Sequence, residues 1–231
     1  MDDAHRLQRL GERAAAEVPD RALVGLGTGS TADAMLHALA VRVRDGLRMT
    51  GVATSESTVT QARRLGIPLV SIDEVERLDL CIDGADEIDP RLNVVKGRGG
   101  ALLYEKLVAE RAERFIIIAS AEKLVAQLGT RLPLPVEIVR FGHTHTRRRI
   151  ETLGLTSTLR LTSDGSPFVS DGGHSIVDCE TDGIADPHGL ASALKAITGV
   201  VDHGLFVGMA SMALTVDNDG AITEHHAPEH T

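Results

Sequence analysis

Short apolar runs alternate with stretches of helical periodicity through the first half of the chain. The run at residues 22–26 leads through a glycine-rich turn into apolar residues at helical spacing, Ala32, Met35, Leu36, Leu39 and Val43. This order predicts a strand, a turn and a helix. The same alternation predicts further strands at 51–54, 69–72, 78–82 and 115–119, and helices at 59–65 and 101–113. Strands that alternate with helices indicate βαβ units and a mostly parallel, Rossmann-like sheet.

The pattern changes near Pro133 and Pro135, because two prolines interrupt any helix. Beyond them the sequence predicts strands at 156–162, 167–170 and 175–179, with a hairpin turn between the first two, and a helix at 187–197. We therefore predict an α/β fold in which a smaller α+β domain, residues 131–200, is inserted into a Rossmann-like catalytic domain, residues 1–130 plus 201–231. Segments 204–207 and 211–216 return as strands to the first domain, and the polar tail 224–231 is expected to fray.

Length and hydrophobicity narrow the class of protein. The chain has 231 residues, 42% of them hydrophobic, which allows one substantial core with a smaller appended domain. Residues 1–13 carry several charges and lack an apolar centre, so they do not resemble a signal peptide. The longest apolar run is too short to span a bilayer. We therefore expect a protein that does not insert into a membrane.

Charge and rare residue types restrict the partners of the protein. The net charge of -9, from 33 acidic against 24 basic residues, argues against binding to the phosphate backbone of a nucleic acid. The basic run at 147–149 lies in a predicted helix and reads as a solvated face or a subunit contact. Aromatic residues make up only 2%, so recognition must rely on hydrogen bonds rather than on stacking. Cys81 and Cys179 lie far apart in sequence, which fits free thiols in a reducing cytoplasm.

The most informative segment is acidic and reads Asp83-Gly84-Ala85-Asp86-Glu87-Ile88-Asp89. Asp83 and Asp86 follow a predicted strand, and open α/β sheets bind ligands at the carboxyl ends of their strands. One such acid often only stabilises a turn, but two acids beside a glycine-rich loop that carries Lys96 favour chemistry. Glu105 lies in the next predicted helix; alone it would be a solvated helix residue, and it becomes a candidate only because Asp83, Asp86 and Lys96 are close to it in sequence. The spacing does not match a calcium loop and gives no support for magnesium, so we expect no metal.

A second candidate site joins the first strand to the first helix and reads Gly25-Leu26-Gly27-Thr28-Gly29-Ser30-Thr31. Backbone amides and hydroxyls at a helix N-terminus suit a phosphate group. The dinucleotide fingerprint would require glycine where Ser30 stands, and the Walker loop would need a Gly-Lys pair that is absent here. We favour phosphate or phosphosugar binding over the alternative, a tight turn that Ser30 or Thr31 caps.

Other polar motifs point less clearly to a role. The turn at 54–58 opens at the same sheet edge, where it would either line the same crevice or cap the next helix through Ser57 or Thr58. His143 and His145 would face one side of a strand, yet they show no zinc-ligand spacing with cysteines or acids. Ser30 has no identifiable His and Asp partners, and neither cysteine lies in a nucleophile signature, so we expect no covalent Ser or Cys chemistry.

Taken in order, four motifs closely resemble ribose-5-phosphate isomerase type A: Gly27-Thr28-Gly29-Ser30-Thr31, Asp83-Gly84-Ala85-Asp86-Glu87-Ile88, Lys96-Gly97-Arg98-Gly99-Gly100-Ala101 and Glu105-Lys106. The likeness continues through Lys123 and segments 133–137 and 199–206, so it covers nearly the whole chain. It implies a cofactor-independent enzyme of the pentose phosphate pathway that interconverts D-ribose 5-phosphate and D-ribulose 5-phosphate. It also implies a homo-oligomer, for which we expect a homodimer or homotetramer in the cytoplasm.

The resemblance assigns roles by position. Glu105 resembles the family's proton acceptor, and Asp83, Asp86 and Lys96 resemble its ring-opening and enediolate-stabilising groups. The positions that resemble substrate contacts are Thr28, Gly29, Ser30, Thr31, Gly84, Ala85, Gly97, Arg98, Gly99 and Lys123. Some members place a phosphate-contacting lysine near the N-terminus, where this chain offers only His5, Arg6 and Arg9. We expect Arg6 or Arg9 to substitute for that lysine.

The proposed reaction explains the residue types. A carboxylate can move a proton from C2 to C1 if both carbons lie within its reach, and an ammonium group stabilises the oxyanion that forms. Two alternatives stay open on the sequence: a non-catalytic phosphosugar-sensing domain, and a coenzyme A transferase of related fold that uses a glutamate nucleophile. The sensor would have little need for Lys96 and Glu105, whereas the transferase would form a thioester.

Overall fold

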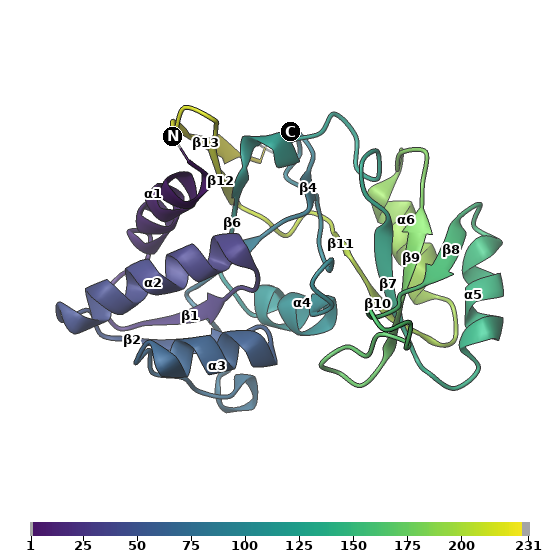
Figure 1. The fold of residues 1–231 in the computed structure, drawn as a ribbon, viewed down its shortest axis with the longest axis horizontal. Coiled ribbons are helices and arrows are strands. Elements are labelled where there is room, and N and C mark those ends of the chain that lie inside the picture. Colours follow the sequence, from purple (N-terminus) through teal and green to yellow (C-terminus); the bar gives the residue numbers. More distant parts are fainter. Residues whose placement is uncertain (1, 228–231) are drawn as a thin grey trace.

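Two separate β-sheets organise the chain and lie side by side in Figure 1. The computed structural model describes residues 2–227. The larger sheet has six strands, in the spatial order β13 (Ile222–His226), β12 (Met212–Val216), β6 (Phe115–Ser120), β3 (Leu80–Gly84), β1 (Ala22–Leu26) and β2 (Met49–Ala53). All neighbouring pairs are parallel except β12 with β13. The predicted α/β class with a mostly parallel sheet is therefore confirmed.

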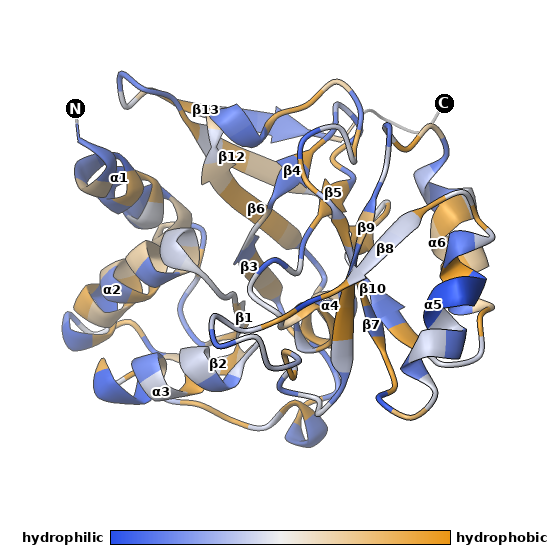
Figure 2. Ribbon diagram, turned by 45° about the vertical axis from the view of Figure 1, so that its right-hand side comes forward, coloured by the Kyte–Doolittle hydropathy of each residue, from blue (hydrophilic) through white to orange (hydrophobic). Residues whose placement is uncertain are grey.

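Both faces of this sheet are buried, which explains why its strands read as continuous apolar runs. In β6, Ile116 and Ile118 face a core formed with two helices, α1 (Asp3–Ala15) and α2 (Ser30–Arg44). Ile117 and Ala119 face the opposite core. Figure 2 shows β6 coloured as hydrophobic along most of its length, whereas the helices carry both colours.

The remaining helices of the first half lie close to the site. They are α3 (Glu56–Arg64), α4 (Leu102–Glu110) and two short 3-10 helices, η1 (Ile72–Glu74) and η2 (Ala121–Lys123). Val108 and Ala109 of α4 pack into the second core of the sheet, so the inner face of this helix is buried. That packing fixes where the polar residues at the start of α4 lie.

The smaller sheet is wholly antiparallel. Its strands follow the order β10 (Val200–His203), β7 (Leu134–Ile138), β9 (Ser175–Glu180) and β8 (Thr156–Leu159). Two helices, α5 (His143–Glu151) and α6 (Pro187–Lys195), contribute Ile150 and Leu194 to its core. A third, short sheet consists of β11 (Leu205–Phe206), β5 (Val94–Val95) and β4 (Glu87–Ile88); β4 and β5 lie between β3 and β6 in sequence, and β11 follows β10.

We propose that these two sheets correspond to two domains, residues 1–130 plus 201–231 and residues 131–200. The hydrogen bonds of β10 with β7 support a second boundary closer to His203 than to Val200. The antiparallel pairing within 134–203 also supports the separation, because an independent sheet with its own hydrophobic core is the usual basis of a domain.

Several local expectations are wrong. Residues 69–72 form a single bridge from Leu69 to Gly51 and then enter η1, rather than a strand. His143 and His145 begin α5, so they lie on a helix and not on one face of a strand. The helix α1 has no counterpart among the predicted elements, although its buried Leu10 and Ala14 pack against α2.

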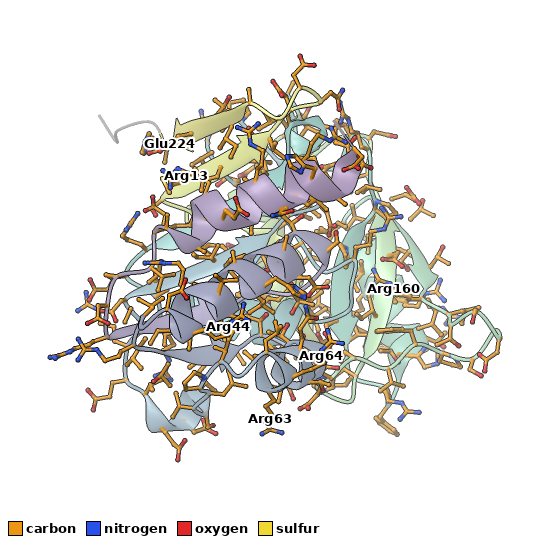
Figure 3. The ribbon with its side chains drawn as sticks, turned by 60° about the vertical axis from the view of Figure 1, so that its left-hand side comes forward. Arg13, Arg44, Arg63, Arg64, Arg160 and Glu224 are labelled. Atoms are coloured by element: carbon orange, nitrogen blue, oxygen red, sulfur yellow. The ribbon has the colours of Figure 1, made fainter. Side chains whose placement is uncertain are left out.

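The polar tail is ordered where fraying was expected. Residues 222–226 form β13, which pairs antiparallel with β12. Arg13 of α1 contacts Glu224 through an ion pair of 3.1 Å, and both side chains are labelled in Figure 3. The strand is stabilised by partners that are distant in sequence, which its own polar composition does not reveal. Residues 228–231 of the predicted tail lie outside the described residues.

The order of strands places a ligand site between β1 and β3. The chain passes from β1 to its neighbour β2 and then returns to the other side of β1 to form β3. Such a reversal leaves a crevice at the carboxyl ends of the two strands, because the loops above them turn in opposite directions. The loops after Leu26 and Gly84 meet at this point.

Candidate active site

A cavity of about 180 Å³ opens at this crevice. Its lining consists of Thr28, Gly29, Ser30, Thr31, Gly84, Ala85, Asp86, Lys96, Gly97, Arg98, Gly99, Glu105 and Lys123. Every one of these residues is a predicted site residue. Asp83 is the remaining predicted position, and it lies directly behind the cavity wall, in contact with Lys96. The structure therefore brings together segments that are up to 95 positions apart, from Thr28 to Lys123.

Asp83 lies in β3 and contacts the loop that follows β1. Its side chain is fully buried, and its Oδ1 accepts hydrogen bonds from Thr28 N at 3.0 Å and Gly84 N at 2.7 Å. Glycine is required at position 27, since a Cβ there would lie 2.3 Å from Asp83 Oδ1. Asp83 therefore holds the backbone of the site in place.

Lys96 follows β5 and is almost completely buried among acids. Its Nζ lies 3.0 Å from Asp83 Oδ2 and 3.5 Å from Glu105 Oε1, and it donates a hydrogen bond to Gly84 O at 2.6 Å. Burial by itself lowers the pKa of Lys96, but the negative charges of Asp83, Glu105 and Asp86 outweigh it and raise the pKa above the ordinary value. The site therefore contains a fixed positive charge.

Glu105 lies in the first turn of α4, 5% exposed. Its pKa is raised to about 8, because burial and the negative charges of Asp83 and Asp86 raise it more than Lys96 lowers it. Its Oε2 is buried and has no hydrogen-bond partner among residues 2–227. A carboxyl group with raised basicity and a free oxygen is suited to accept a proton.

Asp86 and the loop after Lys96 form the opposite wall. Asp86 Oδ2 accepts a hydrogen bond from Arg98 N at 3.1 Å, and the Asp86 side chain is half-buried. The loop turns at Gly97 and Gly100, whose φ values of 108° and 85° strongly favour glycine. The glycines therefore let the loop close around the cavity with its backbone.

The N-terminus of α2 borders the other end of the cavity. Gly29 is the cap residue and provides no side-chain hydrogen bond, so the less favoured alternative, a turn that Ser30 or Thr31 caps, is wrong. A second cavity of about 270 Å³ shares Ser30, Thr31, Ala85 and Lys123 with the first and is also lined by Arg6. The amides of α2, Lys123 and Arg6 could bind an anion here, although Asp3 and Glu122 also line this cavity.

Arg6 and Arg9 are separated by this geometry. The Arg6 side chain is 17% exposed, and its guanidinium contacts Asp3 and Asn218 beside the second cavity. Arg9 is exposed and lines neither of the two cavities. Of the two candidates at the N-terminus, only Arg6 is therefore placed near the loop at residues 28–31.

The turn at 54–58 supports the site from behind. Ser55 caps α3 by accepting a hydrogen bond from Thr58 N, so the alternative in which Ser57 or Thr58 caps the helix is wrong. The Thr28 hydroxyl lies 2.8 Å from both Thr54 Oγ1 and Ser55 Oγ. These hydroxyls hold the first loop, and no residue of the turn lines the cavity that contains Lys96.

Other candidates lie elsewhere. His143 and His145 belong to α5 and do not line either cavity. Within residues 2–227 no group of three or more His, Cys, Asp or Glu side chains is arranged to hold a metal ion. Cys81 and Cys179 are free thiols that are buried in the cores, and burial raises the pKa of both. One contact that the sequence does not indicate is that of Arg160, which reaches the Gly97 and Arg98 carbonyls from the smaller sheet.

Fold and site together define a class of protein: an α/β enzyme with a buried carboxylate and ammonium pair beside a helix N-terminus. Residues 50–220 match the family model described as ribose 5-phosphate isomerase A (phosphoriboisomerase A). The chain belongs to this family. It is 52% identical over 230 residues to ribose-5-phosphate isomerase A of Roseiflexus sp. (strain RS-1), covering 99% of this chain and 98% of the relative. It is also 52% identical over 226 residues to the protein of that name from Synechococcus sp. (strain JA-3-3Ab), covering 96% and 98%.

Solved structures agree in fold over almost the whole chain. Ribose 5-phosphate isomerase from Plasmodium falciparum has a TM-score of 0.94 and 35% identity, covering 98% of this chain and all of that one. A D-ribose-5-phosphate isomerase in complex with phospho-erythronic acid has a TM-score of 0.94 and 30% identity, covering 98% of this chain and 100% of that one. The family relationship identifies the chain as an isomerase and supports neither the sensor nor the coenzyme A transferase.

Proposed function

We propose that the protein interconverts D-ribose 5-phosphate and D-ribulose 5-phosphate through an enediolate, as a step of the pentose phosphate pathway. Membership of the ribose 5-phosphate isomerase A family supports the reaction. The observation that carries the mechanism is the position of the Glu105 carboxylate, 3.5 Å from Lys96 Nζ in a cavity with an anion-binding end.

Glu105 is the proposed proton shuttle. In the open-chain aldose, a carboxylate oxygen removes the C2 proton and returns it to C1, so that the carbonyl moves from C1 to C2 and no atom is gained or lost. The free Oε2 of Glu105 is available for this transfer. Its raised pKa makes its ionised form a stronger base than a carboxylate in water.

Lys96 is the proposed stabiliser of the enediolate. Negative charge develops on the substrate oxygen only as the proton leaves, so a fixed ammonium favours the transition state over the neutral ground state. Asp83 and the Gly84 carbonyl hold the ammonium group in position. Little reorganisation is therefore needed when the charge appears.

The two aspartates have different proposed parts. Asp83 Oδ1 already accepts two backbone hydrogen bonds and its Oδ2 faces Lys96, so its main contribution is to hold that lysine. Asp86 is half-buried and lines the cavity, which makes it the better candidate for opening the sugar ring and for moving the proton between O1 and O2.

The phosphate is proposed to bind at the N-terminus of α2, with Ser30, Thr31, Lys123 and Arg6 around it. A related D-ribose-5-phosphate isomerase was solved in complex with phospho-erythronic acid, which supports a phosphorylated ligand. Arg6→Ala is expected to raise KM for ribose 5-phosphate about threefold to tenfold with little change in kcat. Arg9→Ala is the matched control, and an equal effect of both variants would contradict the assignment.

The direct test is to incubate the purified protein with ribose 5-phosphate in the presence of EDTA and to measure ribulose 5-phosphate. Activity should persist in the chelator, and loss that added metal restores would reverse the interpretation of the carboxylates. Allose 6-phosphate and arabinose 5-phosphate should be compared as substrates. Hydroxylamine trapping with acyl-coenzyme A provides a negative control, because only a transferase would form a covalent thioester.

We further propose that the protein acts in the cytoplasm as a homodimer or homotetramer, with a small phosphosugar as its partner and no nucleic acid. The free thiols Cys81 and Cys179 support a reducing compartment. Within residues 2–227, none of the helices is both long and apolar enough to cross a membrane. Analytical ultracentrifugation would measure the number of subunits.

A further inference from the structure

An arginine of the smaller sheet reaches across to the active-site loop. Arg160 directly follows β8, and its backbone continues the sheet by donating from N to Ile176 O at 2.8 Å and accepting from Phe168 N at 2.9 Å. Its guanidinium is held by Asp178 of β9, with 2.9 Å between Nε and Oδ2 and a second contact from Nη2 to Oδ1. The side chain is 15% exposed, and Figure 3 labels it beside the strands of this sheet.

The remaining guanidinium nitrogen contacts the loop after Lys96. Arg160 Nη1 lies 3.0 Å from Gly97 O and 2.9 Å from Arg98 O, so one nitrogen donates toward two successive carbonyls. The Phe168 ring packs against the same loop, since a Cβ at Gly100 would lie 2.4 Å from its Cζ. The smaller sheet therefore contacts a glycine-rich segment that is otherwise held by hydrogen bonds from Gly100 N to Gly97 O and from Arg98 N to Asp86 Oδ2.

Fixing these two carbonyls also fixes the amides that follow them. In a planar trans peptide the C=O and the next N–H point in opposite directions. Because Gly97 O faces Arg160, Arg98 N points away from it, and Arg98 N indeed donates to Asp86 Oδ2 at 3.1 Å. Because Arg98 O also faces Arg160, Gly99 N must point away too. Gly99 N has no hydrogen-bond partner among residues 2–227, and Gly99 lines the cavity.

We propose that Arg160, supported by Asp178, is a positioning residue that orients the Gly97–Gly99 backbone so that Asp86 is fixed and the Gly99 amide is presented to the sugar. This inference rests on the proposed isomerase function. It assigns a role in that reaction to the smaller sheet, which contributes no side chain to the cavity lining.

The arrangement also explains why an arginine is needed. Its planar group can bind a carboxylate with Nε and Nη2 while Nη1 remains directed at a backbone. A lysine at this position has a single ammonium group that cannot span the Asp178 carboxylate and both carbonyls in the same way. Arg160→Lys should therefore restore only part of what Arg160→Ala loses.

The experiment compares Arg160→Ala with Arg147→Ala. Arg147 also donates a hydrogen bond within the smaller sheet, to Ser157 Oγ at 3.2 Å, but it contacts no residue of the active site. For Arg160→Ala we expect kcat/KM with ribose 5-phosphate to fall about 10- to 100-fold, as a displacement of about 1 Å at a site can cause. Millimolar methylguanidinium should restore part of the activity by replacing the missing group. Arg147→Ala should remain close to the wild type and should not respond to methylguanidinium.

A second measurement follows the loop without substrate turnover. Arg98 is exposed, so trypsin should cut after it faster in Arg160→Ala than in Arg147→Ala, as judged by mass spectrometry of the peptide that begins at Gly99. If the wild type does not isomerise ribose 5-phosphate, the proposed function fails while this cleavage still tests the positioning role. If the wild type is active and the two variants behave alike in both measurements, the positioning role is overturned.

Loss of folding in Arg160→Ala would show as a changed far-UV circular dichroism spectrum. Asp178→Asn then provides the test, because it keeps the arginine and removes the charge that holds it. We expect a smaller fall in kcat/KM and faster cleavage after Arg98. Unchanged activity and cleavage in both Asp178→Asn and Arg160→Lys would contradict the proposal.

Discussion

Replacing Glu105 with Gln separates catalysis from stability. The substitution keeps the shape of the side chain and removes the base, and Asp83 cannot replace it because it is already engaged by Lys96 and two amides. A positioned general base contributes about 10²- to 10⁴-fold to a rate. We expect kcat to fall toward the upper part of that range, about 10³- to 10⁴-fold, which corresponds to about 4 to 5.5 kcal/mol in activation free energy.

The folded state should tolerate the same change. The pKa of Glu105 is raised to about 8, mainly by burial, so the folded protein binds this proton more tightly than the unfolded chain does. The resulting stabilisation is complete below the unfolded pKa, about 4.5, and is lost as the pH rises through about 8. A neutral Gln avoids that loss. Above pH 8 the melting temperature of the variant should therefore equal or exceed that of the wild type.

The assay measures kcat, KM and the melting temperature of both proteins at several pH values, together with the affinity for a phosphosugar by calorimetry. Glu105→Asp is a useful companion, because it keeps the charge but shortens the reach of the carboxylate. Retention of most of the activity in Glu105→Gln would remove Glu105 from the base role. Loss of phosphosugar affinity or a large fall in melting temperature would show that the side chain is chiefly structural.

The other predictions concern the groups around Glu105. The value of kcat/KM should rise with pH as Glu105 ionises. Asp86→Asn should move this rise to lower pH, because the charge of Asp86 is one of those that raise the pKa of Glu105. An unshifted pH profile in this variant would contradict that explanation. Lys96→Gln should lower kcat about 10²- to 10³-fold, as measured by steady-state kinetics. It should also destabilise the fold by about 3–5 kcal/mol in denaturant unfolding, because two buried carboxylates lose their counterion. Gly27→Ala places a Cβ 2.3 Å from Asp83 Oδ1 and should lower the free energy of unfolding by about 1–3 kcal/mol. Gly66→Ala is the control, because its added Cβ meets no atom within 4 Å. Its φ of 76° means that this control reports backbone strain alone.

The sequence alone predicted the alternating elements and the glycine-rich and acidic turns for a local reason, whereas contacts such as Lys123 came from the family resemblance. Strand β1 and the first core helix appear in the sequence as an apolar run followed by helical spacing, and the glycines and acids lie at the strand ends where a parallel sheet places its ligands. Because these signals depend on neighbours within a few residues, they can be read without the fold. The resemblance to a known family then supplied the roles proposed for Glu105 and Lys96.

The tertiary structure decided what depends on residues that are far apart in sequence. Polar β13 is ordered because β12 and Arg13 lie beside it. Ser55 caps α3, and its hydroxyl also contacts Thr28, 27 positions away in sequence. The raised pKa of Glu105 arises only when burial removes water and the charges near it become fixed. Arg160 meets the active-site loop across 62 positions of sequence, and no local pattern encodes such a contact.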